Sequence, residues 1–315
     1  MKPTSQDTGK YRTNTKDQFY TSPGVAKKCI EILISRLHNA ALHSPAPVLP
    51  LSSYLWVEPS AGNGVFLNNI PDTYDKIGID IEPGSANIIK QDFLTWVPPE
   101  QNQKPVIIFG NPPFGRQSSL AKAFIAHSCK FASTTTIAFI LPRSFVKPSM
   151  SCAFDLHFHC IHSSEVERNA FVLGGDGGST DETYDVPCVF QIWQKRSLPR
   201  IVPEKITEKG FQYVKETDPH DIVIRRVGVY AGRCFDGNNN NNNATEYNKQ
   251  THYFIKLDGQ FVAVSHVKEI VDKVNAHVFP TNTTGPRSLS KPEINIVLNA
   301  VLNAVVGACT HAENL

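Results

Sequence analysis

The chain has 315 residues, of which 41% are hydrophobic and 19% are charged, so it can form a core and exceeds a single domain of about 150 residues. The 31 Lys and Arg residues nearly balance the 29 Asp and Glu residues, which excludes a histone-like or membrane-surface protein and leaves only a local patch for nucleic-acid contacts. No apolar run reaches the about 18 residues that span a bilayer, and the first residues lack the apolar segment of a secretory signal. Seven scattered cysteines without a CxxC motif favour reduced thiols in the cytoplasm or nucleus.

The first predicted element is a helix that begins at Pro23, with Ser22 as its cap, and continues through residues 24–37. A Pro/Ser-rich connector at residues 44–53 separates it from four apolar runs at 54–58, 76–81, 106–110 and 136–141. Unbroken apolar runs are typical of parallel strands that are covered on both faces. Two alternating runs, at 154–162 and 187–195, favour antiparallel or edge strands. We therefore expect an α/β fold, Rossmann-like and doubly wound, with a mostly parallel sheet.

The character of the sequence changes near residue 197, which predicts a domain of residues 1–197 and a smaller α+β region of residues 198–315. The Asn-rich tract at 237–243 cannot bury apolar surface, so we expect a disordered loop there. The capping box Ser290-Lys-Pro-Glu293 and an apolar stripe from Ile294 to Val305 predict a C-terminal helix that docks on the protein body.

A Gly-rich turn, EPSAGNG (58–64), follows the first apolar run. Gly62 and Gly64 lack a Cβ and would let the backbone approach a nucleotide-like ligand; a simple tight turn is the alternative. Position 67 is Leu where the dinucleotide fingerprint requires Gly, and the Gly-Lys-Ser/Thr of a phosphate-binding loop is absent. Because Glu58 would repel a pyrophosphate, the turn favours a cationic or neutral nucleoside ligand.

Acidic residues follow the next two strands. Asp80 is placed to accept hydrogen bonds from both hydroxyls of a ribose, with Glu82 as the second candidate. Asp92 and Phe93 combine a carboxylate with an aromatic face, which suits an adenine amino group and its ring. Each of these residues alone is more typical of a surface acid than of a ligand-binding residue, but their order after successive strands favours a ligand site.

The segment FGNPPFG (109–115) lies at the carboxyl end of the third apolar run, where open α/β sheets bind ligands. Two prolines stiffen this turn, so the Asn111 side-chain oxygen and the Pro112 carbonyl can accept both hydrogens of an exocyclic amine. Phe114 would offer a face to a base removed from its stack. The expected catalytic residues are Asn111, Pro112, Pro113 and Phe114.

Together these motifs resemble the S-adenosylmethionine-dependent, amino-group-specific nucleic-acid methyltransferases, whose motifs read here EPSAGNG, GID, QDF and NPPF. The resemblance covers residues 11–195 and implies a seven-stranded class I sheet with a C-terminal target-recognition region. It implies methyl transfer to adenine N6 in nucleic acid, with DNA ahead of RNA. The segment DQFYTSP (17–23) is similar to the family's methionine-binding segment. The implied cofactor residues are Phe19, Tyr20, Thr21, Glu58, Ser60, Ala61, Gly62, Gly64, Asp80, Asp92, Phe93 and Asn111.

Other activities remain open. They are an RNA adenine-N6 methyltransferase acting on a cap or on ribosomal RNA, a cytosine-N4 enzyme, and an enzyme that methylates a protein glutamine. A nucleic-acid-binding module without turnover is the non-catalytic alternative. The predicted substrate contacts, besides Phe114, are Pro142, Phe145, Arg225, Arg226, Arg233 and Tyr253, with Arg287 and Lys291 as further candidates.

No metal site is expected. The residues His157, His159, Cys160 and His162 are spaced like ligands, but the period of a strand places Cys160 on the face opposite His157 and His159. Hydrogen-bonded strand histidines are therefore the interpretation that we favour. Pro187-Cys188 matches half of a zinc-deaminase signature, yet position 191 is Gln where the second cysteine would stand.

Overall fold

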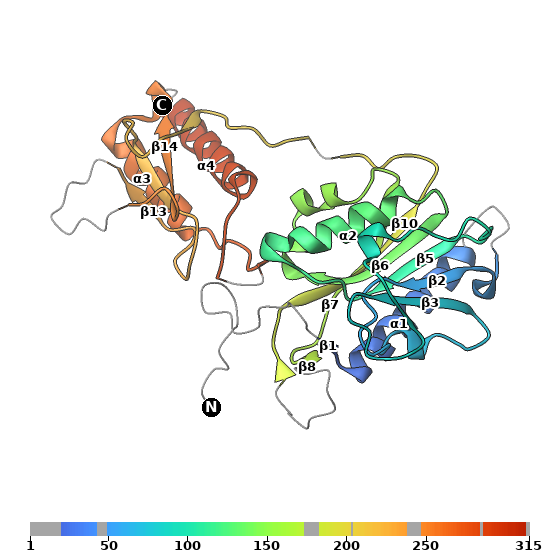
Figure 1. Ribbon diagram of the computed structural model, residues 1–315. Helices are drawn as coiled ribbons and strands as arrows, with labels where there is room; N and C mark the ends of the chain where they lie inside the picture. Colours follow the sequence, from blue (N-terminus) through green and yellow to red (C-terminus); the bar gives the residue numbers. More distant parts are fainter. Residues whose placement is uncertain are drawn as a thin grey trace. The chain divides into compact units, whose positions relative to one another are not determined.

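The computed structural model describes residues 20–42, 49–172, 183–202, 204–237, 247–283 and 286–312. Contacts divide the chain into two compact units, a larger unit (Met1–Ile201) and a smaller unit (Val202–Leu315), which are drawn in Figure 1. Phe19 and, apart from Gly237, the predicted Asn-rich loop lie outside the described residues.

The larger unit is built on a seven-stranded sheet of order β4-β3-β2-β5-β6-β10-β7. Five strands are parallel to one another: β2 (Leu55–Glu58), β3 (Asp75–Asp80), β4 (Ile88–Lys90), β5 (Val106–Gly110) and β6 (Thr134–Pro142). β10 (Cys188–Lys195) runs antiparallel between β6 and β7 (Phe158–Glu165). The predicted mostly parallel α/β sheet is confirmed. Strand order reverses between β2 and β5, and such a switch point opens a crevice at the carboxyl ends of the strands.

Helices α1 (Pro23–Leu42) and α2 (Ser119–Lys130) lie on opposite faces of this sheet, as Figure 1 shows. Successive strand residues point to opposite faces: Trp56 packs in the core of α1, and Val57 packs in the core of α2. Because both faces are covered, the strands need apolar residues at every position, which explains the unbroken apolar runs. The predicted first helix is confirmed, and it extends to Leu42.

A small antiparallel sheet of order β1-β8-β9 holds the start of the described chain. Its strands are β1 (Tyr20–Thr21), β8 (Phe171–Val172) and β9 (Thr183–Tyr184). Thr21 pairs with Phe171, and the Ser22 N–H donates to the Ala170 carbonyl (2.9 Å). This pairing fixes Tyr20 and Thr21 at the entry to α1.

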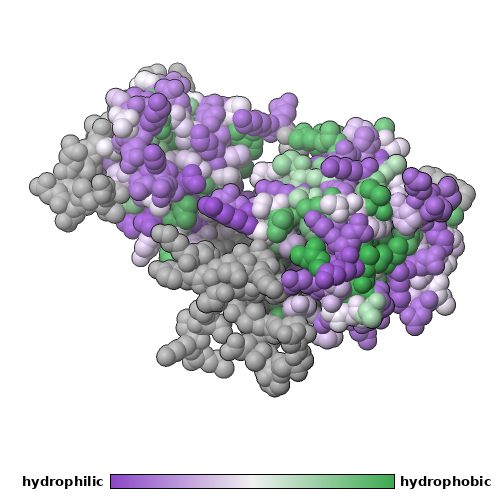
Figure 2. Space-filling model, in the orientation of Figure 1, coloured by the Kyte–Doolittle hydropathy of each residue, from purple (hydrophilic) through white to green (hydrophobic). Residues whose placement is uncertain are grey.

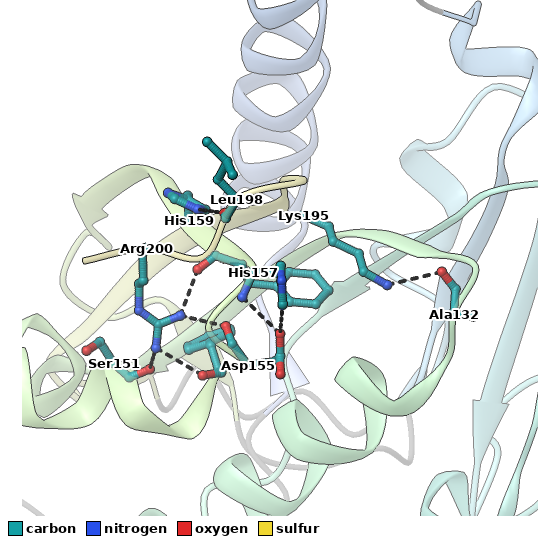
Figure 3. A network of polar contacts seen from close by, with 10 residues as sticks. Ala132, Ser151, Asp155, His157, His159, Lys195, Leu198 and Arg200 are labelled. Atoms are coloured by element: carbon teal, nitrogen blue, oxygen red, sulfur yellow. Dashed lines mark hydrogen bonds and ion pairs between the residues drawn. The ribbon is translucent and has the colours of Figure 1, made fainter. Parts of the chain in front are cut away.

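Arg200 secures the end of the larger unit (Figure 3). Its guanidinium donates to the backbone carbonyls of Ser151, Phe154, Asp155 and Phe158 at 2.5–3.0 Å. A planar guanidinium has five N–H donors and is suited to such a set of acceptors. These hydrogen bonds connect the segment that follows β10 to residues 151–155, which precede β7, and to the first residue of β7.

The histidines near β7 each contact a neighbour. His157 Nδ1 contacts Asp155 Oδ1 (3.1 Å), and His159 Nε2 contacts the Leu198 carbonyl (2.9 Å), as seen in Figure 3. His162 Nε2 contacts Ser164 Oγ (3.0 Å). No group of three His, Cys, Asp or Glu residues among the described residues could hold a metal ion.

The smaller unit contains a four-stranded antiparallel sheet of order β11-β14-β12-β13. Its strands are β11 (Phe211–Val214), β12 (Ile222–Arg225), β13 (Cys234–Asp236) and β14 (His252–Leu257). Helices α3 (Val264–Ala276) and α4 (Lys291–Ala312) share one apolar core with this sheet. The Ser290 N–H donates to Glu293 Oε2 (2.8 Å), the reciprocal half of the predicted capping box.

The predicted apolar stripe of α4 is buried in this core, from Ile294 through Leu298 to Val305. The predicted C-terminal helix is therefore confirmed. Within the described part of the chain, no helix has the length and apolar character needed to cross a membrane.

Candidate functional site

A cavity of about 290 Å³ opens in the larger unit beside the carboxyl ends of β2, β3 and β5. This is the edge at which open α/β sheets bind ligands. The structure brings together here most of the residues that the sequence predicted to bind a cofactor. Those that line the cavity are Tyr20, Thr21, Glu58, Ser60, Ala61, Gly62, Asp80, Asp92, Phe93 and Asn111, and Pro113, which the sequence predicted as a catalytic residue, also lines it.

The Gly-rich turn forms one wall of the cavity. Gly62 has φ +51°, and a Cβ there would lie 3.1 Å from Cε1 of Tyr20. Gly64 has φ +80°, and its N–H donates to the Ala61 carbonyl (2.6 Å), which closes the turn. Both conformations favour glycine. Gly62 exposes backbone at the cavity, whereas Gly64 shapes the turn without lining it.

Asp80 anchors this turn. Its Oδ2 accepts a hydrogen bond from the Gly62 N–H (2.7 Å), and its Oδ1 accepts one from the Glu82 N–H (2.8 Å). The sequence predicted that both oxygens would accept ribose hydroxyls; in the structure both already accept backbone donors. A carboxylate oxygen has a second lone pair, so Asp80 can still accept from a ligand. Glu82, which also lines the cavity, presents a second carboxylate at this wall.

Glu58 lies at the base of the cavity and is only 1% exposed. Its Oε2 accepts a hydrogen bond from the Leu67 N–H (2.9 Å). Burial, and to a smaller extent the charge of Asp80, raises the pKa of Glu58 well above its usual value of 4.5. Gly110, at φ +131°, passes so close that a Cβ would lie 3.2 Å from Cγ of Glu58. Through this hydrogen bond, Glu58 fixes Leu67, which begins the short helical segment after the Gly-rich turn.

Asn111 connects the three segments around the cavity. The Ser60 hydroxyl donates to the Asn111 backbone carbonyl (2.9 Å). The Asn111 side-chain Nδ2 donates to the Thr21 hydroxyl (3.2 Å). Because the amide nitrogen is turned toward Thr21, the orientation of the amide oxygen is also set. These two hydrogen bonds join the first strand, the Gly-rich turn and the NPPF segment, which are far apart in the sequence.

Aromatic residues close the side of the cavity near α2. The Phe93 ring is 1% exposed, and its centroid lies 5.2 Å from that of Phe124. Asp92 Oδ1 accepts a hydrogen bond from the Leu94 N–H (2.8 Å) and so caps the turn in which Phe93 lies. Asp92 and Phe93 thus have structural partners in addition to their position at the cavity.

Phe114 and Phe145 differ from their predicted role as base-contacting rings. Phe114 is 8% exposed and packs in the core on the α1 side, and Phe145 is 4% exposed and packs in the core on the α2 side. Neither lines the cavity, nor do Pro112 and Pro142. Burial of these apolar rings stabilises the fold, and sequence alone did not distinguish a buried ring from a presented one.

Apolar cavity residues that the sequence did not predict include Ile81, Leu94, Leu120 and Phe124. Ile81 is 63% exposed and Leu120 is 38% exposed, so the cavity has an apolar rim. Figure 2 shows hydrophobic patches on the displayed face of the larger unit. Leu120 follows a turn in which Gln117 and Ser118 adopt positive φ (53° and 60°), a feature that the sequence does not reveal. Such strained backbone is concentrated at functional sites.

The predicted contacts in the smaller unit differ in their surroundings. The Arg226 guanidinium lies over the Tyr253 ring (5.1 Å to the centroid), and the Tyr253 hydroxyl donates to the Leu289 carbonyl (3.2 Å). The Arg225 guanidinium lies over the Tyr230 ring (5.9 Å). Arg233 and Arg287 line a separate pocket. Lys291 Nζ lies 4.2 Å from the Tyr213 ring centroid.

Comparison with known proteins identifies no matching family model and no matching curated sequence. Solved structures with similarity include the 23S rRNA methyltransferase ErmE, at 15% identity and a TM-score of 0.39, over 58% of this chain and 71% of that chain. A proposed RNA methyltransferase, PH1948 of Pyrococcus horikoshii, has 14% identity and a TM-score of 0.40, over 58% and 90%. A proposed hemolysin from Streptococcus thermophilus has 11% identity and a TM-score of 0.37, over 59% and 70%. Because the identities and scores are low, no activity is transferred from them.

Proposed function

We propose that the chain is an S-adenosylmethionine-dependent methyltransferase that acts on the exocyclic N6 amine of adenine in nucleic acid. The observation that carries this proposal is the junction at Asn111. Its backbone accepts from Ser60 of the Gly-rich turn, and its side chain donates to Thr21 of β1. The Gly-rich turn and Asn111 therefore line one cavity, and Pro112, the second proposed acceptor, directly follows Asn111 in the sequence without lining it.

The residues present fit the cofactor. The cavity volume of about 290 Å³ lies near the lower end of the range for small-molecule sites. Gly62 exposes its backbone at the cavity, and Asp80 and Glu82 line the wall where ribose hydroxyls would bind. The apolar residues Phe93, Leu94 and Phe124 would contact the adenine ring of the cofactor. When bound, S-adenosylmethionine would supply an electrophilic methyl group.

The residues of this chain would act on the amine. The Asn111 side-chain oxygen and the Pro112 carbonyl would accept its two hydrogens, which draws the nitrogen lone pair out of conjugation with the ring. The Thr21 hydroxyl, by holding Asn111 Nδ2, reduces the reorganisation needed when substrate binds. The nitrogen loses a proton to solvent only after it has gained the methyl group, so no strong base is required.

The activity is tested by incubating the full chain with S-adenosylmethionine and separate pools of DNA, RNA and protein, followed by mass spectrometry of the hydrolysed products. The proposal predicts N6-methyladenine in DNA or RNA. N4-methylcytosine or methylglutamine as the main product would overturn the assignment to adenine, and the absence of methyl transfer to all pools would overturn the enzymatic function.

A further inference from the structure

The smaller unit contains its own pocket, of about 410 Å³. The residues named for the proposed reaction all belong to the larger unit. The walls of the pocket come from the loop between β12 and β13, the end of α3 and the segment before α4. Charged and polar lining residues are Arg233, Arg287, His277 and Asn275, and neither Asp nor Glu lines the pocket.

The arginines of this unit gather around the pocket loop. Only four arginines occur between Val202 and Leu315: Arg225, Arg226, Arg233 and Arg287. Backbone hydrogen bonds connect the segments that carry them: Arg225 N–H to the Arg233 carbonyl (2.8 Å) and Gly228 N–H to the Arg287 carbonyl (2.9 Å). Four guanidinium groups on three adjoining segments create a local positive charge.

No ion pair of these arginines occurs among the residues that the structure describes. Among the described residues, the ion pairs of the smaller unit join Lys256 to Asp221 and Lys273 to Glu269, and none involves an arginine. Arg225 and Arg226 lie over the tyrosine rings described above, and Arg233 lies over the Phe235 ring (5.5 Å to the centroid). Of the four arginines, Arg233 and Arg287 line the pocket. A guanidinium without a carboxylate partner is well suited to a phosphate, which it can bind through two parallel hydrogen bonds.

The pocket rim is apolar and aromatic. Val229 is 85% exposed, Tyr230 60% and Val278 85%, and the first two line the pocket. An inorganic anion would gain nothing from such a rim. A nucleotide would, because its base can stack on Tyr230 while its phosphate binds the arginines.

Hydrogen bonds and close packing hold the loop in place. Gly232 has φ +102°, and a Cβ there would overlap the ring of Phe279, which is 4% exposed. The Gly232 N–H donates to the Arg225 carbonyl (2.7 Å), and the Arg233 N–H donates to the Tyr230 carbonyl (3.0 Å). Asn275 fixes the base of the loop by donating to and accepting from the backbone of Cys234 (3.0 and 2.8 Å).

We infer that this pocket binds one unpaired nucleotide of a single-stranded nucleic-acid segment, with its phosphate at Arg233 and Arg287 and its base against Tyr230. This inference rests on the proposed function, since it specifies how the nucleic-acid substrate is held. The concave shape favours an unpaired strand. A base in a duplex is held in its pair inside the helix, whereas a base of a single strand can turn into the pocket.

Fluorescence anisotropy with the full chain tests the inference, using labelled 12-nucleotide single-stranded DNA and RNA and the matching duplexes. We expect single strands to bind more tightly than duplexes, and Arg233→Ala and Arg287→Ala each to weaken single-strand binding about tenfold. Each arginine substitution should also reduce, by about 0.7, the magnitude of the slope of the logarithm of the association constant against the logarithm of the salt concentration. Lys268→Ala, which removes an exposed lysine from α3, is the matched control and should have little effect.

Two further variants separate stacking from structure. Tyr230→Phe should retain binding, and Tyr230→Ala should weaken it at least fivefold. Tighter binding of duplexes, equal losses in Lys268→Ala and Arg233→Ala, or unchanged binding in both arginine variants would overturn the inference. Comparison of the affinities for the DNA and RNA strands shows whether the pocket prefers a deoxyribonucleotide or a ribonucleotide.

The outcome is distinguishable from that of the proposed function. Methyl transfer to adenine, together with wild-type oligonucleotide binding by Arg233→Ala and Arg287→Ala, would contradict the pocket assignment alone. Arginine-dependent binding of single strands in a protein that transfers no methyl group would contradict the methyltransferase proposal alone.

Discussion

The cavity of the larger unit and the pocket of the smaller unit differ more in chemistry than in size. The cavity of the larger unit, about 290 Å³, has four carboxyl side chains, Glu58, Asp80, Glu82 and Asp92, and no lysine or arginine. The pocket of the smaller unit, about 410 Å³, has two arginines and no carboxylate. The first suits a cationic or neutral nucleoside and the second an anionic nucleotide. Under the proposed function, the cavity of the larger unit would hold the cofactor and the reacting amine, and the pocket of the smaller unit would hold another nucleotide of the substrate.

The largest expected effect comes from the acceptor side chain in the first cavity. Asn111→Ala should lower kcat by about 10²–10³-fold, the range for loss of one preorganised polar group, and leave cofactor affinity nearly unchanged. Single-turnover methylation and calorimetric titration with S-adenosylmethionine measure the two quantities. Asn102→Ala, in the turn at the opposite end of β5, is the control. A wild-type rate for Asn111→Ala would contradict its role.

The second prediction concerns the rigidity of the smaller pocket. Gly232→Ala should destabilise the smaller unit by about 1–3 kcal/mol, because the new Cβ meets the Phe279 ring in a left-handed conformation. Gly259→Ala is the matched control, since a Cβ there meets nothing within 4 Å. Hydrogen exchange of the β12 and β13 amides reports the effect. Equal protection in the two variants would show that the loop does not depend on glycine.

The third prediction concerns the anchor of the Gly-rich turn. Asp80→Asn replaces one acceptor of the Gly62 and Glu82 hydrogen bonds by a donor, and cofactor affinity should fall about tenfold. Asp75→Asn, at the exposed start of the same strand, removes only an ion pair with Lys104 and should leave affinity unchanged. An unaltered dissociation constant in Asp80→Asn would exclude the anchoring role.

The smallest expected effect is a pH dependence. Since the folded state raises the pKa of Glu58, the native protein retains a proton that the unfolded chain loses. The contribution of Glu58 to the free energy of unfolding is therefore lost as the pH rises from about 4.5 through the pKa of Glu58 in the folded protein. Glu58→Gln preserves an acceptor for Leu67 and should show a flatter profile.

The larger unit can be followed for this purpose by tryptophan fluorescence in urea, because the three tryptophans of the chain, Trp56, Trp96 and Trp193, all belong to it. A constant difference in unfolding free energy between wild type and Glu58→Gln across the pH range would contradict the buried-carboxyl account.

The sequence predicted the parallel sheet well because its strands are covered on both faces and appear as unbroken apolar runs. It also placed the Gly-rich turn and Asn111 at strand ends that the fold brings together. It did not predict that Asp80 binds the Gly62 and Glu82 amides, because hydrogen bonds to the backbone depend on the path of the turn. It also missed the burial of Phe114, which depends on packing against the distant helix α1.

In the smaller unit the sequence located the arginines but not their partners. Arg226 and Arg233 belong to one short segment, yet Arg226 lies over Tyr253, whereas Arg233 lies over Phe235 and lines a pocket. The separation arises from Gly228 and Gly232, whose positive φ values reverse the chain between them. A local pattern of basic and aromatic residues does not contain that information.

Transfer of a deuterated methyl group from S-adenosylmethionine to a single-stranded oligonucleotide that contains one adenine tests the proposed activity most sharply. The wild-type chain should place one labelled methyl on N6, and none when purine, which has no exocyclic amine, replaces that adenine. Equal labelling of the two oligonucleotides would contradict it.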